Sequence, residues 1–155
     1  MRKTFNLIAP AVLCLAVGFV ASRFQADSLQ TWYPSLAKPS LTPPNIVFPV
    51  VWTLLYICMG LSVGLILNSA TSFRRQLLVV IFIMQLALNF CWSLIFFYFQ
   101  NPAGGLVVII LLVACLILYA VKAWPISQAA SALFWPYIFW TAFATYINAY
   151  IALNN

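Results

Sequence analysis

Aromatic and amide side chains recur at four-residue intervals in three apolar stretches of this sequence, and they are the side chains best suited to chemistry. Residues four apart lie on one face of an α-helix. An amide in hydrocarbon is costly unless it finds a partner, so we expect these amides to point inward. If the three faces converge, they line an aromatic pocket with a few polar groups, which is typical of a site for a flat apolar ligand. The residues are Trp52 and Tyr56, then Gln85, Asn89, Trp92, Ser93 and Phe96, then Trp140, Ala144 and Asn148.

The same spacing has a second, purely structural interpretation. Tryptophan and tyrosine are common at membrane interfaces, and amides often only join helices. On spacing alone this structural interpretation is the favoured one.

The chain lacks most of the groups that enzymes use. It has no histidine, and its only acidic residue is Asp27. Paired-carboxylate catalysis, a Ser-His-Asp triad and an ordinary zinc or iron site are therefore excluded. No carboxylate or histidine lies in an apolar stretch, which disfavours ion-driven transport. We expect no catalytic residues, no metal site and no required cofactor.

The composition indicates that lipid is the solvent for most of the surface. The chain has 155 residues, of which 66% are hydrophobic and 5% are charged. A soluble domain carries about 25% charged residues. The seven basic residues lie singly or in pairs near the ends of apolar stretches, so the net charge of +6 is not a nucleic-acid footprint.

Five apolar stretches predict a single all-α domain, a polytopic bundle of five transmembrane helices. One span needs about 20 apolar residues. The first stretch follows two basic residues and could instead be a signal peptide, but it is long for one and its cleavage pattern is weak. Pro136 lies inside the fifth helix and should kink it. The expected helices cover residues 5–24, 46–68, 77–99, 106–123 and 128–153.

The longest polar segment, residues 25–45, is expected to form a loop that folds back over the bundle as a lid. Four prolines among residues 34–44 forbid a regular helix there. The pair Trp32-Tyr33 resembles an interfacial anchor.

Two further patterns concern packing and orientation. Gly60 and Gly64 form a GxxxG pattern, for which we favour packing inside the bundle over dimerisation. With five spans, five of the seven basic residues fall on the side of the N-terminus, and Arg23 and Lys38 on the other. The positive-inside rule then places the N-terminus in the cytoplasm and the Trp32 loop outside.

Ordered motifs from Trp32 to the C-terminus resemble the TspO/translocator protein family, also called tryptophan-rich sensory proteins or peripheral benzodiazepine receptors. The stretch that matches the fourth helix is similar only in hydrophobicity. The motifs are Trp32-Tyr33 with Leu36, Lys38-Pro39, Pro43-Pro44, Phe48-Pro49, Val51-Trp52-Thr53, Leu55-Tyr56, Gln85-Leu86, Leu88-Asn89, Trp92-Ser93, Phe96-Phe97, Pro136-Tyr137, Trp140, Ala142 to Thr145 and Asn148.

The resemblance implies five transmembrane helices, often in a homodimer, and a pocket that the first loop covers. It also implies binding of porphyrins, and for bacterial members a proposed light-dependent breakdown of protoporphyrin. Without histidine, we expect a tetrapyrrole to be held by stacking and amide contacts, with no need for iron. Carried over by motif, the ligand-binding residues are Trp32, Tyr33, Trp52, Tyr56, Asn89, Trp92, Trp140, Ala144 and Asn148.

Two departures from the family pattern bear on the ligand. Ser40-Leu41 stands where many bacterial members have a further tryptophan, so the lid has less aromatic surface. The C-terminal stretch lacks the basic residue of the proposed cholesterol motif, which leaves little reason to expect sterol binding.

The sequence therefore predicts a membrane receptor or sensor for porphyrins or related flat apolar ligands, in a bacterial cell membrane. One alternative is a passive transporter of tetrapyrroles or small lipids, and another is a purely structural or partner-binding membrane protein.

Overall fold

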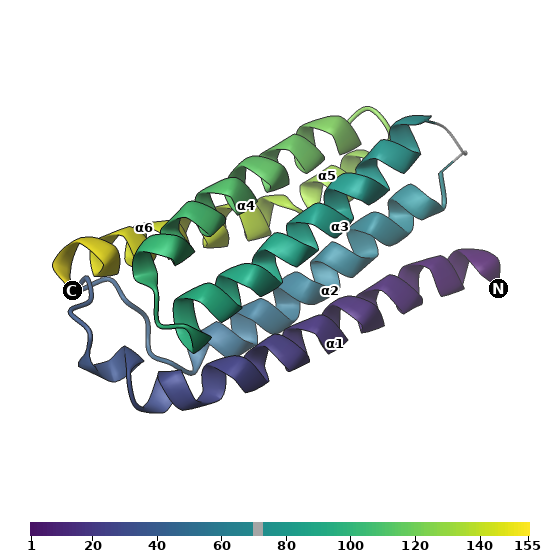
Figure 1. Cartoon of the computed structure of the whole chain (residues 1–155). Coiled ribbons are helices and arrows are strands. Elements are labelled where there is room, and N and C mark those ends of the chain that lie inside the picture. The colour runs from purple at the N-terminus through teal and green to yellow at the C-terminus, as the bar shows by residue number, and fades with distance from the viewer. Residues whose placement is uncertain (70–72) are drawn as a thin grey trace.

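The computed structural model describes residues 1–69 and 73–155. It confirms the predicted all-α architecture, a bundle of five long helices with the lid at one end (Figure 1). A 3₁₀ turn, η1, lies in the lid, and a π-helical segment, η2, continues the third helix. The elements are α1 (Arg2–Gln30), η1 (Tyr33–Ser35), α2 (Val47–Leu67), α3 (Phe73–Ser93), η2 (Leu94–Tyr98), α4 (Pro102–Ala123), α5 (Gln128–Ala132) and α6 (Trp135–Asn154).

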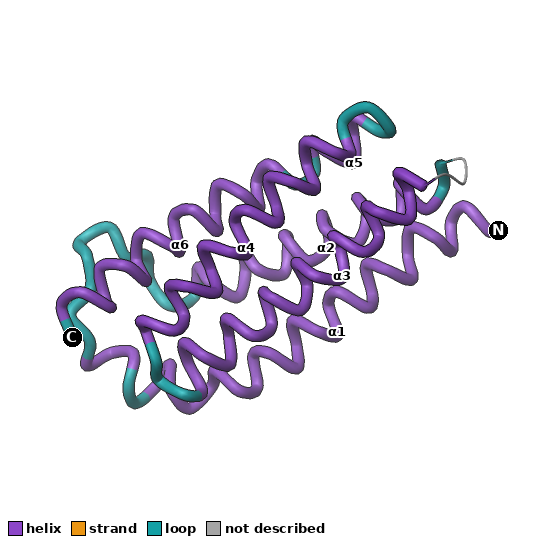
Figure 2. The backbone as a smooth tube through the Cα atoms, turned by 45° about the horizontal axis from the view of Figure 1, so that its top comes forward, coloured by secondary structure: helices purple, strands orange, loops and turns teal. Residues whose placement is uncertain are grey.

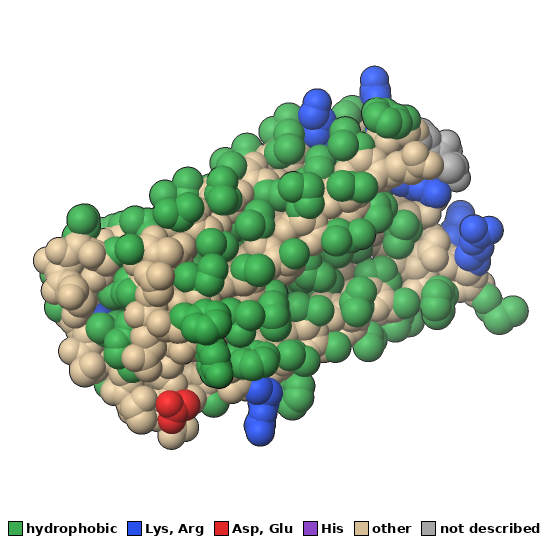
Figure 3. Space-filling model, in the orientation of Figure 1, with side chains coloured by type: hydrophobic (Ala, Val, Ile, Leu, Met, Phe, Trp, Pro, Cys, Tyr) green, Lys and Arg blue, Asp and Glu red, His purple; other side chains and the backbone are tan. Residues whose placement is uncertain are grey.

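The protein is a multi-pass integral membrane protein. Four helical rods in the described ranges, namely α1, α2, α3 with η2, and α4, are long and apolar enough to cross a membrane. The fifth, α6, has 20 residues, among them Trp, Tyr and Asn side chains that lower its hydropathy. Apolar side chains cover the side of the bundle, and basic side chains gather mainly at the end that holds the N-terminus (Figure 3).

The long helices run alternately up and down. The N-terminus, the end of α2 and the end of α4 lie at one end of the bundle, and the lid and the C-terminus at the other (Figures 1 and 2). Helix α1 packs against α2, α3 against α4, and α4 against α6.

The first helix extends further than expected. It ends at Gln30 instead of residue 24, so the lid loop comprises residues 31–46. Residues 25–30 are polar but contain no glycine or proline, and such residues can continue a helix. The first proline after this segment, Pro34, lies in the 3₁₀ turn η1 that follows the end of α1.

The expected fifth helix is divided in two. Helix α5 ends at Ala132, a turn covers residues 133–134, and α6 begins at Trp135. Pro136 therefore lies in the first turn of a new helix, where its missing N–H costs little, and it does not kink a continuous one. Helix α5 is capped by Ser127, whose hydroxyl accepts a hydrogen bond from the Ala130 N–H at 3.2 Å.

The connections on either side of α3 are also shorter than expected. The third helix was expected to begin at residue 77, but α3 begins at Phe73; residues 70–72 lie outside the described ranges. Helix α4 begins at Pro102 and is capped by Asn101, whose side chain accepts from the Gly104 N–H at 2.9 Å. Asparagine followed by proline is a favoured helix start, which moves the beginning of α4 into the expected turn.

The GxxxG pattern packs inside the bundle, as favoured. A Cβ added at Gly60 would collide with the backbone of Ala11, and one at Gly64 would meet the Asn6 carbonyl. The end of this contact is fixed by Asn6, which donates to the Asn68 side chain at 2.9 Å. In the half of the bundle near the N-terminus, the backbones of α1 and α2 therefore approach closely.

Candidate ligand-binding site

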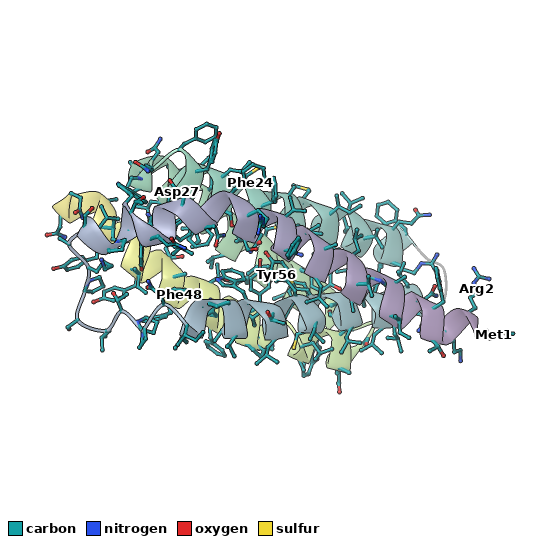
Figure 4. The ribbon with its side chains drawn as sticks, turned by 90° about the horizontal axis from the view of Figure 1, so that it is seen from below. Met1, Arg2, Phe24, Asp27, Phe48 and Tyr56 are labelled. Carbon is teal, nitrogen blue, oxygen red and sulfur yellow. The ribbon has the colours of Figure 1, made fainter. Side chains whose placement is uncertain are left out.

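A cleft of about 460 Å³ opens between α1, α2 and α3 in the half of the bundle near the lid. Helix α2 contributes Phe48, Trp52 and Tyr56, which lie four residues apart on one face. Figure 4 looks onto α1 and α2, with Tyr56 lying between them. The full lining is Leu15, Gly18, Phe19, Ala21, Ser22, Gln25, Leu29, Asn45, Phe48, Pro49, Trp52, Thr53, Tyr56, Asn89 and Ser93.

A buried chain of hydrogen bonds closes the inner wall of the cleft. The Tyr56 hydroxyl donates to Asn89 Oδ1 at 2.6 Å, and Asn89 Nδ2 donates to the Tyr137 hydroxyl at 2.9 Å. The three residues come from α2, α3 and α6, so one amide ties three helices together. Gln85, Asn89 and Asn148 are each at most 1% exposed, which confirms that the amides point inward.

A second amide bridge lies deeper and nearer the lid. Trp92 Nε1 donates to Asn148 Oδ1 at 3.0 Å, and Asn148 Nδ2 donates to the Pro102 carbonyl at 2.7 Å. The bridge joins α3 and α6 to the start of α4.

Beyond the cleft lie two small cavities of about 20 Å³ each, here called the inner chambers. The first shares Gln25, Leu29, Phe48 and Trp52 with the cleft. The second reaches Ala144 and Asn148 on α6, and it shares with the first Tyr33, Phe48, Trp92 and Phe97. Stacked rings fill this region, for example Trp92 on Phe96 with ring centroids 5.7 Å apart. The remaining residues around the chambers are Phe96 and Ile147.

The lid is organised around a lysine. Lys38 Nζ donates to the carbonyls of Tyr33 at 2.6 Å, Leu36 at 3.0 Å and Pro34 at 3.2 Å. The same ammonium lies 4.9 Å from the centre of the Tyr33 ring, a cation–π contact. Tyr33 is 3% exposed, and burial raises its pKa to about 12, so its hydroxyl stays neutral at physiological pH. The lid thereby holds a neutral aromatic ring over the inner chambers.

The nine residues expected from the family motifs do not surround one open cavity. Three of them line the cleft, one of which, Trp52, also lines the first inner chamber, and four more line the inner chambers alone. Trp32 packs against Phe96 and lines a separate hollow of about 340 Å³ at the lid end of the bundle. Trp140 packs against Phe48 at 5.8 Å between ring centroids. The cleft residues are Trp52, Tyr56 and Asn89, and the chamber residues are Tyr33, Trp92, Ala144 and Asn148.

The sequence analysis missed three residues that shape this region. Phe48 lies four residues before Trp52, so the spacing that singled out Trp52 and Tyr56 extends to it. Gln25 was assigned to the loop, yet it lies in α1 and donates to the Ser93 hydroxyl at 2.7 Å. Gly18 leaves the space that the Tyr56 ring occupies, and no sequence pattern indicates that contact.

A second hollow, of about 490 Å³, is a groove on the outer face of α1 and α3. Its lining has no hydrogen-bonding side chain that could orient a ligand, so the cleft is the better candidate site. The groove residues are Ala16, Val17, Val20, Ile83, Leu86, Ala87 and Phe90. In the described part of the chain, no three histidine, cysteine or acidic side chains come together to hold a metal ion.

Comparison with known proteins gives a consistent picture over nearly the whole chain. The model of the TspO/MBR family matches residues 10–153. The Tryptophan-rich protein TspO of Chlorobaculum tepidum is 42% identical over all of this chain and 99% of its own length. The protein of the same name from Archaeoglobus fulgidus is 42% identical, over 97% of each chain. The human Translocator protein is 33% identical, over 96% of this chain and 86% of its own.

The family match agrees with the arrangement of the residues, since the matched region contains the cleft, the lid and the inner chambers. The resemblance drawn from the motifs is confirmed by these comparisons. The chain belongs to the TspO/MBR family.

Proposed function

We propose that this protein is a membrane receptor or sensor that binds porphyrins or related flat apolar ligands between its helices. The observation that carries the proposal is the cleft of about 460 Å³, with tryptophan, tyrosine and amide side chains on its walls. Ligand sites are commonly about 300–1,000 Å³, mostly apolar, with a small number of placed polar groups.

The lining favours an uncharged, aromatic ligand core. The Trp52 and Tyr56 rings offer faces for stacking, and no charged side chain lines the cleft. Trp140 lines neither the cleft nor the chambers, but its ring packs on Phe48, which lines all three. Its Nε1 is buried without a hydrogen-bond partner among the described residues, so it would be a donor to an oxygen of a ligand that takes the place of the Phe48 ring.

The position of the cleft supports access from the bilayer. Its outer lining includes the exposed residues Phe19, which is 67% exposed, and Thr53, and both lie within helices apolar enough to span a membrane. A ligand dissolved in lipid would meet this opening without crossing water. In our proposal the N-terminus lies in the cytoplasm of a bacterial cell and the lid outside, because most basic residues lie at the N-terminal end.

The same lateral opening favours one alternative, passive transport of tetrapyrroles or small lipids. The five apolar stretches contain no carboxylate or histidine that could couple movement to an ion. Flux of protoporphyrin into sealed vesicles, with and without the protein, tests this function. Equal flux in the two cases would reject transport and retain only the binding function.

Any light-dependent breakdown of the ligand would depend on the tryptophans, because the chain has no acid–base pair. Absorbance spectra of the protein with protoporphyrin, recorded in light and in dark, test this extension. It fails if the bound porphyrin bleaches no faster than free porphyrin in empty lipid.

The binding proposal is tested by titrating the purified protein with protoporphyrin and following tryptophan fluorescence. A variant with Trp52→Phe and Trp140→Phe should bind more weakly, by about 2- to 12-fold, because one hydrogen bond contributes roughly 0.5–1.5 kcal/mol. The matched control is Trp124→Phe with Trp135→Phe, since both residues are exposed. Unchanged affinity in the first variant, with the protein folded, would contradict the proposal.

A further inference from the structure

One side chain borders the cleft and both inner chambers. Phe48 lines the cleft and each of the two small cavities. Trp52 lines the cleft and the first chamber, and the second chamber is the one that reaches Ala144 on α6. The cavities therefore form a series from the lipid-facing opening to α6. Tyr33, Trp92 and Phe97 also lie between the two chambers, but of these lining residues Phe48 is the one that borders the cleft as well.

Phe48 is held in place by rings from two other parts of the chain. Its ring meets the Tyr33 ring of the lid at 6.4 Å and the Trp140 ring of α6 at 5.8 Å, both nearly edge to face. Such contacts contribute about 0.5–1.5 kcal/mol each beyond the area they bury. They therefore favour the observed position of the Phe48 ring by an amount small enough for the ring to leave it at times.

The backbone under Phe48 is the part of α2 that can move at least cost. Phe48 is the second residue of the helix, and Pro49 follows it. The first four N–H groups of a helix have no partner within it, so the first turn is the least constrained. Here the Val47 N–H donates to the Pro44 carbonyl of the lid at 2.9 Å, which couples this turn to the lid loop.

We propose that Phe48 is a gate between the cleft and the inner chambers, and that a ligand reaches α6 only when the Phe48 ring swings away. This inference rests on the proposed ligand-binding function of the same site. With the ring displaced, the cleft and the chambers join into one cavity lined by Trp52, Trp92, Ala144 and Asn148. Contact with Tyr33 makes the position of the lid part of the gate.

The gate can be tested without any porphyrin, by the reactivity of a cysteine placed behind it. Ala144 is 7% exposed and lines the far chamber. In a variant whose four native cysteines are replaced by alanine, Ala144→Cys is treated with N-ethylmaleimide in lipid nanodiscs. A minor conformation is commonly populated at about 0.1–10%, so we take this as the population in which the Phe48 ring is displaced. Because Phe48→Ala removes the ring altogether, it should accelerate labelling of Ala144→Cys at least about tenfold.

Two controls separate gating from a general loosening of the fold. Phe19→Ala removes a ring of the same size from the cleft, but Phe19 borders neither chamber, so labelling of Ala144→Cys should not change. Ser22→Cys, at the exposed side of the cleft, should react at the same rate with and without Phe48→Ala. Phe48→Leu keeps more of the packing and should give an intermediate rate if Phe48→Ala does not fold.

The outcomes distinguish this inference from the proposed function. Labelling that Phe48→Ala and Phe48→Leu leave unchanged, or that Phe19→Ala accelerates equally, would overturn the gate. Accelerated labelling in a protein that does not bind protoporphyrin would retain the gate and reject only the proposed ligand.

Discussion

The two halves of the bundle are built from similar apolar residues but are packed in different ways. In the half near the N-terminus, Gly60 and Gly64 bring α1 and α2 into backbone contact. There Tyr119 stacks on Phe134 with ring centroids 4.0 Å apart, and Ser62 donates to the Ala130 carbonyl at 2.7 Å. The half near the lid holds the cleft and the inner chambers. Small residues let the backbones of α1 and α2 approach closely in the first half, whereas the Tyr56 ring lies between the same two helices beside the cleft.

Helix α1 produces the difference, because it changes its partner along its length. Its first half packs on the glycines of α2. Its second half is bound to the end of α3 and to η2, where Ser28 donates to the Phe97 carbonyl at 2.6 Å and Gln25 donates to Ser93. Where α1 exchanges contact with α2 for contact with η2, the cleft opens between α1 and α2.

The π-helical turn of η2 supplies one of these attachments. A π-helical turn disrupts the regular i to i+4 pattern of the backbone and is often found at functional sites. The Phe97 carbonyl accepts the Ser28 hydroxyl, and the rings of Phe96 and Phe97 lie 4.8 Å apart beside the chambers. The π-helical turn η2 therefore lies directly beside the inner chambers.

The largest expected effect is in the closely packed half. Gly60→Leu should destabilise the protein by about 3 kcal/mol or more, since overpacking a fitted contact forces the helices apart. The measurement is the thermal unfolding midpoint in nanodiscs. Leu54→Phe, on the lipid-facing side of the same helix, is the control and should have little effect. Equal midpoints for the two variants would mean that the halves do not differ in packing.

A smaller effect is expected at the hydrogen bonds that border the cleft. Asn89→Leu leaves the hydroxyls of Tyr56 and Tyr137 without their amide, and should destabilise the protein by about 1–2 kcal/mol. Tyr56→Phe removes only one of the bonds and should cost about half as much. The same unfolding midpoint measures both. If Asn89→Leu is as stable as the native protein, the amide is not what joins α2, α3 and α6.

The smallest effect sharpens the comparison within the lid half itself. Trp92→Phe loses a hydrogen bond to Asn148 and should lower stability by about 0.5–1.5 kcal/mol. Trp140→Phe loses a similar ring area but no hydrogen bond, because no described residue pairs with its Nε1, so its loss of stability should be the smaller of the two. A larger loss for Trp140→Phe than for Trp92→Phe would show that Trp140 is structural and does not serve the ligand.

The sequence predicts the helices well but not their ends or their rotations. Apolar stretches and the spacing of Asn89 and Asn148 indicate spans and inward faces, because a buried amide needs a partner wherever the helix lies. The end of α1 depends on the attachment of Gln25 and Ser28 to η2, which is a tertiary contact. That dependence also explains why Gln25 was missed.

The shape of the site was less predictable than its residues. Four-residue spacing shows that Trp52 and Tyr56 share a face, but not that this face borders α1 and that Gly18 provides the space. It also does not show that the rings around Trp92 would fill the inner chambers, because helix rotation and ring packing are decided together in three dimensions.

The most direct test of the account fills each of the two hollows in turn. Gly18→Leu places a side chain against the Tyr56 ring in the cleft, and Ala87→Leu fills the outer groove between α1 and α3. Quenching of tryptophan fluorescence by protoporphyrin is then titrated for both, after each has been shown to be folded. We predict that Gly18→Leu abolishes binding and Ala87→Leu leaves it unchanged. Native affinity in Gly18→Leu, with loss of binding in Ala87→Leu, would contradict the assignment of the cleft as the ligand site.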